Sequence, residues 1–316
     1  MGNSKETPGQ ARGDGGSQDR FQALLQHALG EAITRELQES LVVEVLVNPD
    51  GKVWVEYLSR GKKSLTVILS TVQRENIIKL LASHHHMIVD ANNPELACEI
   101  PNIGIRFQGW LPPVVSEACF TLRKPASQIF SLDNYVSANQ MTAEQSQQLK
   151  TAIQNKQNII VAGGTGSGKT TFTNALLAEL TETQERILVI EDVPELQVAA
   201  VDHVKLCTSP NKSMHDLVKG ALRMRPDRIV IGEVRDGAAL AMLKAWNMGH
   251  PGGICTVHAN SAQDTLLRLH HLVQEVLPAA PISVVEQAVD LIVFIQRNPA
   301  TGFKVAEVLQ LRRQNH

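Results

Sequence analysis

The sequence has few cysteines and no arrangement of them that indicates a disulfide framework or a zinc site. Four of the 316 residues are cysteine, and no two of them form a Cys-x-x-Cys pair. They are widely scattered in apolar surroundings, at Cys98, Cys119, Cys207 and Cys255. This pattern predicts four reduced, buried thiols and a reducing compartment.

Aromatic residues, excess charge and long apolar runs are also scarce. Aromatic residues make up 4% of the chain and the formal net charge is −2, so no basic field favours nucleic acid, and sequence-specific nucleic-acid binding is not expected. No stretch has the apolar length needed to cross a bilayer. The first twenty residues, MGNSKETPGQARGDGGSQDR, lack the apolar core of a signal peptide. We therefore expect a cytoplasmic protein whose membrane association, where present, is peripheral.

The chain is long enough for two domains, and its pattern changes near the middle. Residues 1–19 are polar and glycine-rich and predict a disordered tail. Residues 20–125 predict a smaller α+β domain. It comprises a helix over 21–37, a hairpin around Asn48-Pro49-Asp50-Gly51, a helix capped by Ser70 or Thr71, and three further strands. Residues 126–141 have no strong apolar periodicity and contain scattered polar residues, which predicts a linker.

Residues 142–316 predict an α/β domain with a mostly parallel sheet. Buried apolar strands alternate with helical stretches, which is typical of such a sheet. The strands are NIIVAG, RILVIED, DRIVIGEV and GGICTVHA, and DLIVFIQR and KVAEVLQL predict a terminal hairpin.

The segment after NIIVAG fits the phosphate-binding loop G-x-x-x-x-G-K-[ST], with a strand before it and a helix after it. Glycines let the backbone wrap around a polyphosphate, so that N–H groups and the helix N-terminus face its oxygens. We expect Lys169 to reach the β- and γ-phosphates and the Thr170 hydroxyl to bind Mg²⁺. The predicted ligand is a nucleoside triphosphate bound by Gly163, Gly164, Thr165, Gly166, Ser167, Gly168, Lys169, Thr170 and Thr171.

Three polar residues follow the other buried strands, at the edge where an α/β sheet builds its active site. Glu191 ends RILVIE, Glu233 ends DRIVIGE and His258 follows GGICTV. A phosphate-loop enzyme needs acidic groups to orient Mg²⁺ and the attacking water. Because no Asp stands at the end of the strand before Glu233, this residue is predicted to hold Mg²⁺ through water. His258 is either a structural histidine or a functional one that senses the γ-phosphate or holds a catalytic water.

These segments together resemble one family. GGTGSGKTT, ILVIEDVPEL, RMRPDRIVIGEVRD and GGICTVHANS resemble, in order, the Walker A, Asp-box, Walker B and His-box motifs of the secretion ATPases. These are the traffic ATPases of type II and type IV secretion and pilus machines. The likeness spans residues 158–262. Upstream, IRFQGWLPPVVSEACFTLRKP resembles the end of the N-terminal domain of the conjugation and type IV secretion branch.

The resemblance implies a RecA-like ATPase domain that uses ATP and Mg²⁺ in a homohexameric ring at the cytoplasmic face of the inner membrane. Its partners would be inner-membrane and cytoplasmic components of a secretion or conjugation channel. Glu191 would polarise the attacking water, Glu233 would orient Mg²⁺, and His258 would relay the state of the γ-phosphate. Four arginines are candidates for phosphate contacts or arginine fingers, although each could instead form a surface or interdomain ion pair: Arg106, Arg123, Arg223 and Arg235.

Two features differ from parts of the wider family or allow another interpretation. The four-cysteine zinc module of some branches is not present, so no metal other than Mg²⁺ is expected. The run His84-His85-His86 is interpreted as a solvated helix end, because adjacent histidines do not share a helix face.

Three functions are consistent with this sequence to different degrees. The first is a hexameric motor whose ATP hydrolysis powers assembly of, or transport through, a conjugative type IV secretion system. The second is a nucleotide-dependent scaffold of the same machine with negligible turnover. The third, a soluble kinase or DNA-processing ATPase, is disfavoured because the chain has no second substrate motif, basic stripe or series of stacking aromatics.

Overall fold

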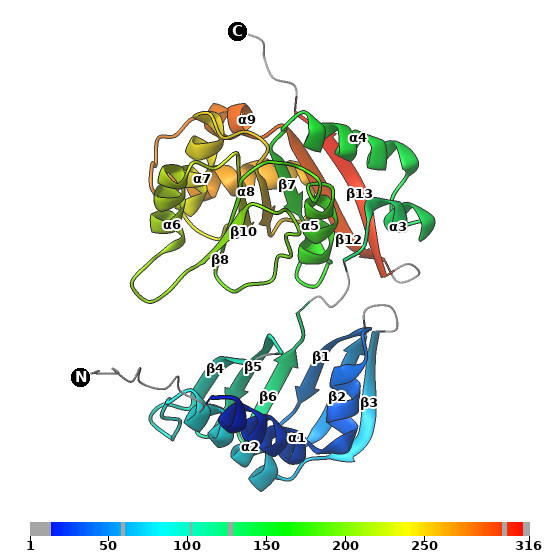
Figure 1. Cartoon of the computed structure of the whole chain (residues 1–316), viewed down its shortest axis with the longest axis vertical. Coiled ribbons are helices and arrows are strands. Elements are labelled where there is room, and N and C mark those ends of the chain that lie inside the picture. Colours follow the sequence, from blue (N-terminus) through cyan, green and yellow to red (C-terminus); the bar gives the residue numbers. More distant parts are fainter. Residues whose placement is uncertain (1–13, 58–60, 102, 126–128, 299–301, 312–316) are drawn as a thin grey trace, which may run out of the picture. The chain divides into compact units, whose positions relative to one another are not determined.

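The chain folds into two compact units, each with its own sheet and its own hydrophobic core (Figure 1). The computed structural model describes residues 14–57, 61–101, 103–125, 129–298 and 302–311. The first unit is Met1–Ser127 and the second is Gln128–His316. Most of the predicted tail, residues 1–13, lies outside the described residues.

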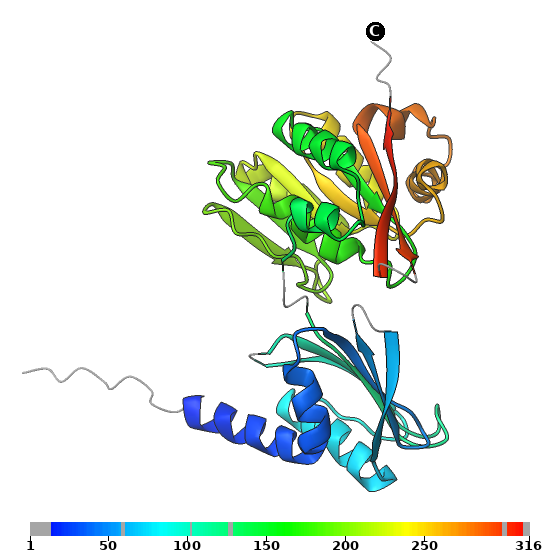
Figure 2. The same ribbon diagram turned by 90° about the vertical axis from the view of Figure 1, so that its right-hand side faces the viewer.

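The first unit is a six-stranded antiparallel sheet with two helices on one face (Figure 2). The strand order is β3-β2-β1-β6-β5-β4. The strands are β1 (Val42–Val47), β2 (Lys52–Tyr57), β3 (Gly61–Ile68), β4 (Glu95–Ile100), β5 (Ile105–Trp110) and β6 (Cys119–Arg123), and the helices are α1 (Asp14–Gln38) and α2 (Thr71–His84).

The core of this unit forms because strands and helices each present one apolar face. Val53 and Val55 of β2 alternate with more exposed neighbours, as expected for a strand with one covered side. On α1, Leu25 and Leu29 are four residues apart and are buried in the same cluster as Ile78 of α2. The helices therefore cover one face of the sheet.

Two local predictions for this unit are confirmed. The hairpin turn is closed by a hydrogen bond from the Gly51 N–H to the Asn48 carbonyl at 2.9 Å, and Gly51 has φ +78°, which favours glycine. Helix α2 begins after Ser70, whose hydroxyl accepts from the Gln73 N–H while the Gln73 side chain accepts from the Ser70 N–H.

The structure also differs from the expectations for this unit. Helix α1 begins at Asp14, inside the range 1–19 predicted to be a tail, and Gly30 (φ 80°, ψ 162°) interrupts it. Strand β3 was not predicted; it lies at an edge of the sheet and most of its residues are half-exposed or exposed, so its apolar pattern is weak.

The second unit is a seven-stranded sheet with the order β13-β12-β7-β11-β10-β8-β9. Every neighbouring pair is parallel except β12 with β13, so the predicted mostly parallel α/β sheet is confirmed. The strands are β7 (Ile159–Ala162), β8 (Ile187–Glu191), β9 (His203–Cys207), β10 (Arg228–Glu233), β11 (Ile254–Val257), β12 (Leu291–Asn298) and β13 (Gly302–Gln310). The helices are α3 (Leu132–Ser137), α4 (Ala143–Gln154), α5 (Lys169–Ala178), α6 (Met214–Ala221), α7 (Ala238–Asn247), α8 (Ala262–Gln274) and α9 (Ser283–Ala288), with a 3₁₀ turn, η1, at Leu222–Met224.

Helices cover both faces of this sheet. Along β7, Ile159 and Val161 pack in one cluster with α3, α4 and α5, whereas Ile160 packs in another with α6, α7, α8 and α9. Successive side chains of a strand point to opposite faces, so a sheet buried on both sides has continuously apolar strands. This explains why all four residues of β7 are buried.

Some segments of the second unit differ from the expectations. Helix α3 lies inside the range 126–141 predicted to be a linker, and its Tyr135 is buried against Phe172 at a ring distance of 5.1 Å. Strand β9, at the sheet edge, was not predicted. The predicted terminal hairpin is confirmed as β12 and β13.

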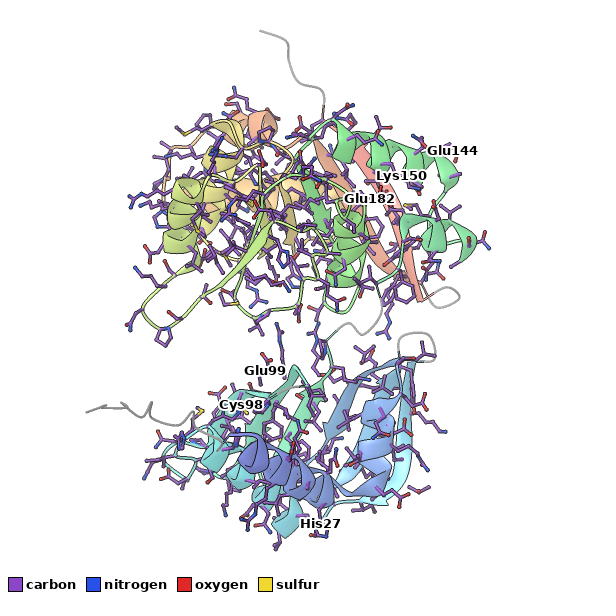
Figure 3. All side chains as sticks on the ribbon, in the orientation of Figure 1. His27, Cys98, Glu99, Glu144, Lys150 and Glu182 are labelled. Carbon is purple, nitrogen blue, oxygen red and sulfur yellow. The ribbon has the colours of Figure 1, made fainter. Side chains whose placement is uncertain are left out.

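The prediction of four buried thiols is correct for Cys255 alone. Cys98, on β4 in Figure 3, and Cys119 are half-buried, and Cys207 is exposed at the end of the edge strand β9. All four are free, as predicted. The histidine run is less solvated than expected: His84 and His85 are half-buried, and the His84 ring stacks on Phe21 at 3.8 Å.

Arg74 provides a test of how the first unit is held together. Its side chain is 2% exposed and donates to the carbonyls of Ala118 (2.6 Å), Leu69 (2.5 Å) and Pro49 (2.7 Å). Arg74→Leu would leave these carbonyls without their donor, so we expect the first unit to lose roughly 3 kcal/mol of unfolding free energy.

Urea unfolding followed by the fluorescence of Trp54 and Trp110, in a Trp246→Phe background, measures this change. Lys79→Leu is the control, because Lys79 makes an exposed pair with Glu75 and should cost less than about 0.5 kcal/mol. Equal effects of the two substitutions would contradict the structural role of Arg74.

Candidate active site

The parallel order of the strands brings the predicted site residues to one edge of the second unit. Strands β7, β11, β10 and β8 are consecutive neighbours in the sheet, and all run in the same direction. The glycine-rich loop follows β7, His258 follows β11, Glu233 ends β10 and Glu191 ends β8. Gly163 and His258, 95 positions apart in sequence, thus share one edge, since each directly follows one of two adjacent strands.

The glycine-rich loop connects β7 to α5. Some of its glycines are required by backbone conformation, and one is required by lack of space for a side chain. Gly166 and Gly168 have φ values of +67° and +89°, which side chains rarely adopt. A Cβ atom on Gly163 would lie 2.3 Å from the Ile295 carbonyl oxygen and 2.5 Å from Ser167 Oγ. A Cβ atom on Gly164 would have no heavy atom of the described residues within 4 Å, so packing within this unit does not require that glycine.

Two features of the loop suit an anionic ligand. Helix α5 begins after Gly168, and no side chain caps its first N–H groups. Ser167 is 4% exposed, and its hydroxyl has no hydrogen-bond partner among the described residues. A phosphate in the loop would supply acceptors for both sets of donors.

Lys169 is almost fully buried inside the loop. Its Nζ donates to the carbonyls of Gly163 at 2.9 Å and Gly164 at 2.8 Å, and lies 3.2 Å from His258 Nδ1. Burial, followed by the charge of Lys169, holds the pKa of His258 below its usual value. A neutral imidazole can therefore accept a hydrogen bond from the Lys169 ammonium group through Nδ1.

Glu233 connects this histidine to an arginine. Its Oε1 lies 2.8 Å from His258 Nε2, and its Oε2 accepts from Arg235 Nη2 at 2.7 Å. Lys169, His258, Glu233 and Arg235 thus form a continuous chain of contacts across β7, β11 and β10. The sequence left two interpretations open for Arg235, a phosphate contact and a surface ion pair. The structure shows the ion pair, with Glu233.

Glu191 lies in a different environment from the one expected for a residue that polarises water. It is 2% exposed, and its Oε1 accepts the backbone N–H groups of Glu195 and Leu196, both at 2.8 Å. Burial raises the pKa of the Glu191 carboxyl, and the two N–H groups oppose that rise. A Cβ atom on Gly232 would come within 3.0 Å of Glu191 Cγ, which explains the glycine before Glu233. The contacts of Glu191 are those of a buried anchor for the segment after β8.

Glu195 is the acidic residue of this segment that contacts the phosphate loop. Its Oε2 accepts from Thr170 Oγ1 at 3.1 Å. The sequence interpretation missed Glu195, because it considered only the acidic residues directly at the strand end. The available signal was the second glutamate in Glu191-Asp192-Val193-Pro194-Glu195.

The contacts described above for this cluster include none of the other candidate arginines. Arg223 is exposed in η1. Arg106 and Arg123 belong to the first unit, where they are opposite each other on β5 and β6. Their predicted phosphate contacts stay predictions.

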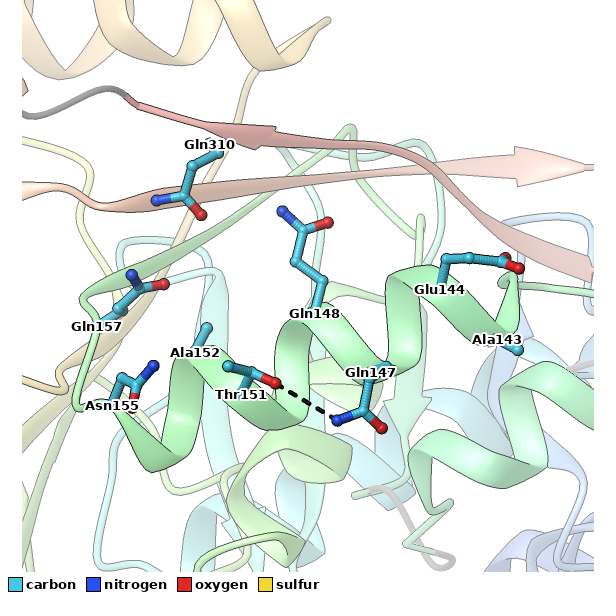
Figure 4. Close-up of a pocket in the computed structure, with 9 residues that line it drawn as sticks. All are labelled: Ala143, Glu144, Gln147, Gln148, Thr151, Ala152, Asn155, Gln157 and Gln310. Atoms are coloured by element: carbon cyan, nitrogen blue, oxygen red, sulfur yellow. Dashed lines mark hydrogen bonds between the residues drawn. The ribbon is translucent and has the colours of Figure 1, made fainter.

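The hollow shown in Figure 4 is separate from this site. It runs along α4 toward Gln310 of β13, and amide side chains such as Gln148 and Gln157 line it. Gln147 donates to Thr151 there at 3.4 Å. Its nine described lining residues include none of the phosphate-loop residues.

Comparison with known proteins identifies the family. The family described as "Type II/IV secretion system protein" matches residues 31–298. The chain belongs to this family. It is 41% identical to the conjugal transfer protein TrbB of Rhizobium radiobacter over 304 residues, covering 95% of this chain and 94% of that protein. It is 32% identical to the type IV secretion system protein VirB11 of Bartonella henselae over 286 residues, covering 78% and 80% of the two chains.

A solved structure shows the same fold. The Legionella pneumophila ATPase DotB matches with a TM-score of 0.64 and 19% identity, covering 97% of this chain and 84% of that one. The likeness and the observed sheet order agree with the predicted RecA-like domain preceded by an α+β domain. Among the described residues, the structure contains no helix of the length and apolarity that a membrane span requires.

The raised pKa of Glu191 predicts a pH-dependent stability difference. The folded pKa lies above the ordinary 4.5, so the protonated form is favoured by folding. The contribution of Glu191 is thus fully present below its unfolded pKa and is lost as the pH rises through its folded pKa. Glu191→Gln keeps an oxygen for the two N–H groups and removes the charge. We expect its thermal unfolding midpoint to rise relative to the wild type as the pH rises from the ordinary 4.5 through the folded pKa of Glu191.

Glu144→Gln is a control of opposite sign. Hydrogen bonds at the start of α4, the backbone N–H of Glu144 first and the Thr142 hydroxyl second, lower the pKa of the Glu144 carboxyl. Because the folded pKa lies below the ordinary 4.5, its substitution should lose stability relative to the wild type as the pH rises toward 4.5, and the difference should stay constant at higher pH. Thermal unfolding of both variants as a function of pH provides the measurement. A difference for Glu191→Gln that does not vary with pH would contradict the assignment.

Proposed function

We propose that this protein hydrolyses ATP in a homohexameric ring and thereby powers assembly of, or transport through, a conjugative type IV secretion system. The observation that carries the proposal is the contact chain Lys169–His258–Glu233, which joins the phosphate loop to the ends of two further strands. The relatives named TrbB and VirB11 support the conjugative and secretory role, and the solved relative DotB is titled an ATPase.

ATP would bind with its β- and γ-phosphates in the loop between β7 and α5. Lys169 would exchange the carbonyls of Gly163 and Gly164 for phosphate oxygens, which are stronger acceptors because they are charged. The hydroxyl of Ser167 and the N–H groups at the start of α5 would complete the phosphate contacts.

The residues around Thr170 suit Mg²⁺. The Thr170 hydroxyl and the Glu233 carboxylate are hard oxygen donors, which this ion prefers. Thr170 would ligate the ion directly, and Glu233 would hold it through water. When bound, Mg²⁺ would neutralise charge on the β- and γ-phosphates.

We propose Glu195, rather than Glu191, as the residue that orients and deprotonates the attacking water. Glu195 contacts Thr170 at the loop, whereas Glu191 is buried and its Oε1 accepts two backbone N–H groups. A general base must lie within hydrogen-bond reach of the proton that it takes. Glu191 would then act by holding the segment that carries Glu195.

His258 would link the state of the phosphates to the neighbouring strand. While Lys169 contacts the loop carbonyls, its Nζ also lies 3.2 Å from His258 Nδ1. A γ-phosphate that draws Lys169 away would free Nδ1, and the contact between His258 Nε2 and Glu233 could transmit this change toward Arg235. The described contacts thus support the relay that the resemblance implies.

Assembly and location complete the proposal. The ring would be bound peripherally at the cytoplasmic face of the inner membrane, with channel components as partners. Arg223 of one subunit, or Arg106 and Arg123 of the first unit, would supply the additional positive charge that phosphoryl transfer requires. The alternative, a scaffold of the same machine that binds nucleotide with negligible turnover, predicts no change of activity in the variants below.

The first test is Lys169→Ala. It removes the cation that faces the β- and γ-phosphates, so we expect ATP hydrolysis to fall below detection and nucleotide affinity to drop severely. Calorimetric ADP binding and phosphate release measure the two effects. Lys150→Ala is the matched control, because Lys150 pairs with Asp133 on the α3–α4 surface (Figure 3). Wild-type turnover of Lys169→Ala would contradict the phosphate-loop assignment.

The second test separates the two glutamates. We expect Glu195→Gln to lower kcat roughly 10²-fold or more while ATP still binds, in line with loss of a positioned general base. Glu191→Gln keeps the acceptor for both N–H groups and should retain most of the activity. Steady-state kinetics of both variants give the comparison. The reverse order of the two effects would return the water-polarising role to Glu191.

The third test addresses the ring. If each site is completed by a neighbouring subunit, mixing inactive Lys169→Ala with inactive Arg223→Ala should restore part of the turnover. In a mixed ring, some subunit interfaces then contain both an intact Lys169 and an intact Arg223. Activity of the wild type should also rise faster than linearly with protein concentration until rings are complete. An isolated monomer with full activity, together with a mixture that stays inactive, would refute the ring.

A further inference from the structure

The segment after β8 has no regular secondary structure, so side chains decide where Glu195 lies. Between the end of β8 at Glu191 and the start of β9 at His203, the chain forms no helix or strand. Leu196 is 1% exposed and packs in the core shared with α5. A loop with few regular contacts keeps its conformation only through specific hydrogen bonds and buried anchors.

Three consecutive backbone N–H groups of this segment donate to side-chain oxygens. Those of Glu195 and Leu196 donate to Glu191 Oε1, as described above, and that of Gln197 donates to Asn174 Oδ1 at 2.9 Å. Lys205 of β9 donates through Nζ to the Leu196 carbonyl. The segment is thus held from the end of β8, from β9 and from helix α5.

Asn174 is the contribution of α5, and its position on that helix is informative. It is fully buried and lies four residues after Thr170, so the two side chains share one face of the helix. Thr170 donates to Glu195, and Asn174 accepts from Gln197, two residues further along the segment. One helical face therefore contacts the segment on both sides of Leu196.

We propose that Asn174 is a positioning residue that sets the distance between Glu195 and the phosphate loop. Helix α5 begins at Lys169 and carries Thr170, so the hydrogen bond that its Asn174 accepts from the Glu195 segment fixes the two parts of the site in one rigid body. The Nδ2 group of Asn174 has no partner among the described residues, so the acceptor Oδ1 carries the function. The inference rests on the proposed role of Glu195 in ATP hydrolysis.

Two isosteric substitutions test the acceptor in the full-length protein. Asn174→Leu keeps the size of the side chain and removes Oδ1, whereas Asn174→Asp keeps an acceptor for the Gln197 N–H. We expect Asn174→Leu to lower kcat roughly 10- to 100-fold, the effect of misplacing a catalytic group, with ADP affinity unchanged. Asn174→Asp should recover a clear part of the lost kcat. Where Asn174→Leu does not fold, Asn174→Ser, whose hydroxyl is too short to reach, replaces it.

Thr173→Val is the matched control. Thr173 is the preceding residue of α5, is fully buried, and its hydroxyl has no partner among the described residues. Its substitution alters the same buried part of the helix without touching the Glu195 segment, so kcat should stay at the wild-type value. A loss equal to that of Asn174→Leu would mean that any change in this part of α5 is harmful, and would overturn the proposal.

A double-mutant cycle decides whether Asn174 acts through Glu195. In a Glu195→Gln background, Asn174→Leu should cause little further loss of kcat, since the group that it positions is already disabled. The same factor of loss in both backgrounds would overturn the proposal. If Glu195→Gln alone leaves kcat unchanged, the role of Glu195 in the proposed function fails and this inference fails with it. If Glu195→Gln lowers kcat and Asn174→Leu does not, only this inference fails.

Discussion

The proposed active site depends on the parallel order of β7, β11, β10 and β8. Because these neighbouring strands run in one direction, the loop after each one emerges at the same edge of the sheet. The phosphate loop, His258, Glu233 and the segment that carries Glu195 meet there without any long connection. The apolar strands that make this possible are buried on both faces, so the position of the site is determined by the core of the second unit.

Close approach between the strand ends explains why small residues flank the charged ones. Gly163 faces the Ile295 carbonyl of β12 across a gap that excludes a side chain, and Gly232 leaves room for the Glu191 side chain. Gly168 has the positive φ that begins α5, and a Cβ atom there would lie 3.0 Å from the Phe303 ring. Each glycine permits a contact between two elements that are distant in sequence.

The contact chain of the site runs from a cation through a neutral imidazole to a carboxylate and a second cation. The Lys169 cation lies beside His258, which burial and that cation keep neutral, and His258 lies beside the carboxylate of Glu233, which pairs with Arg235. Beside this chain, Glu191 and Asn174 serve the backbone of the Glu195 segment rather than the ligand. The site thus separates residues that would bind phosphate from residues that hold others in place.

The sequence by itself determined the α/β class, the parallel strands and the glycine-rich loop with its Lys169, because these follow from local patterns of apolar residues and glycines. It could not assign the carboxylates. Glu191 and Glu195 are four residues apart in one irregular segment, and which of them faces Thr170 depends on the burial of Leu196 and on hydrogen bonds from α5. The edge strands β3 and β9 were also missed, because strands covered on fewer sides lack a strong apolar signal. Only the tertiary structure decides such questions, since they depend on contacts between segments that the chain brings together by folding.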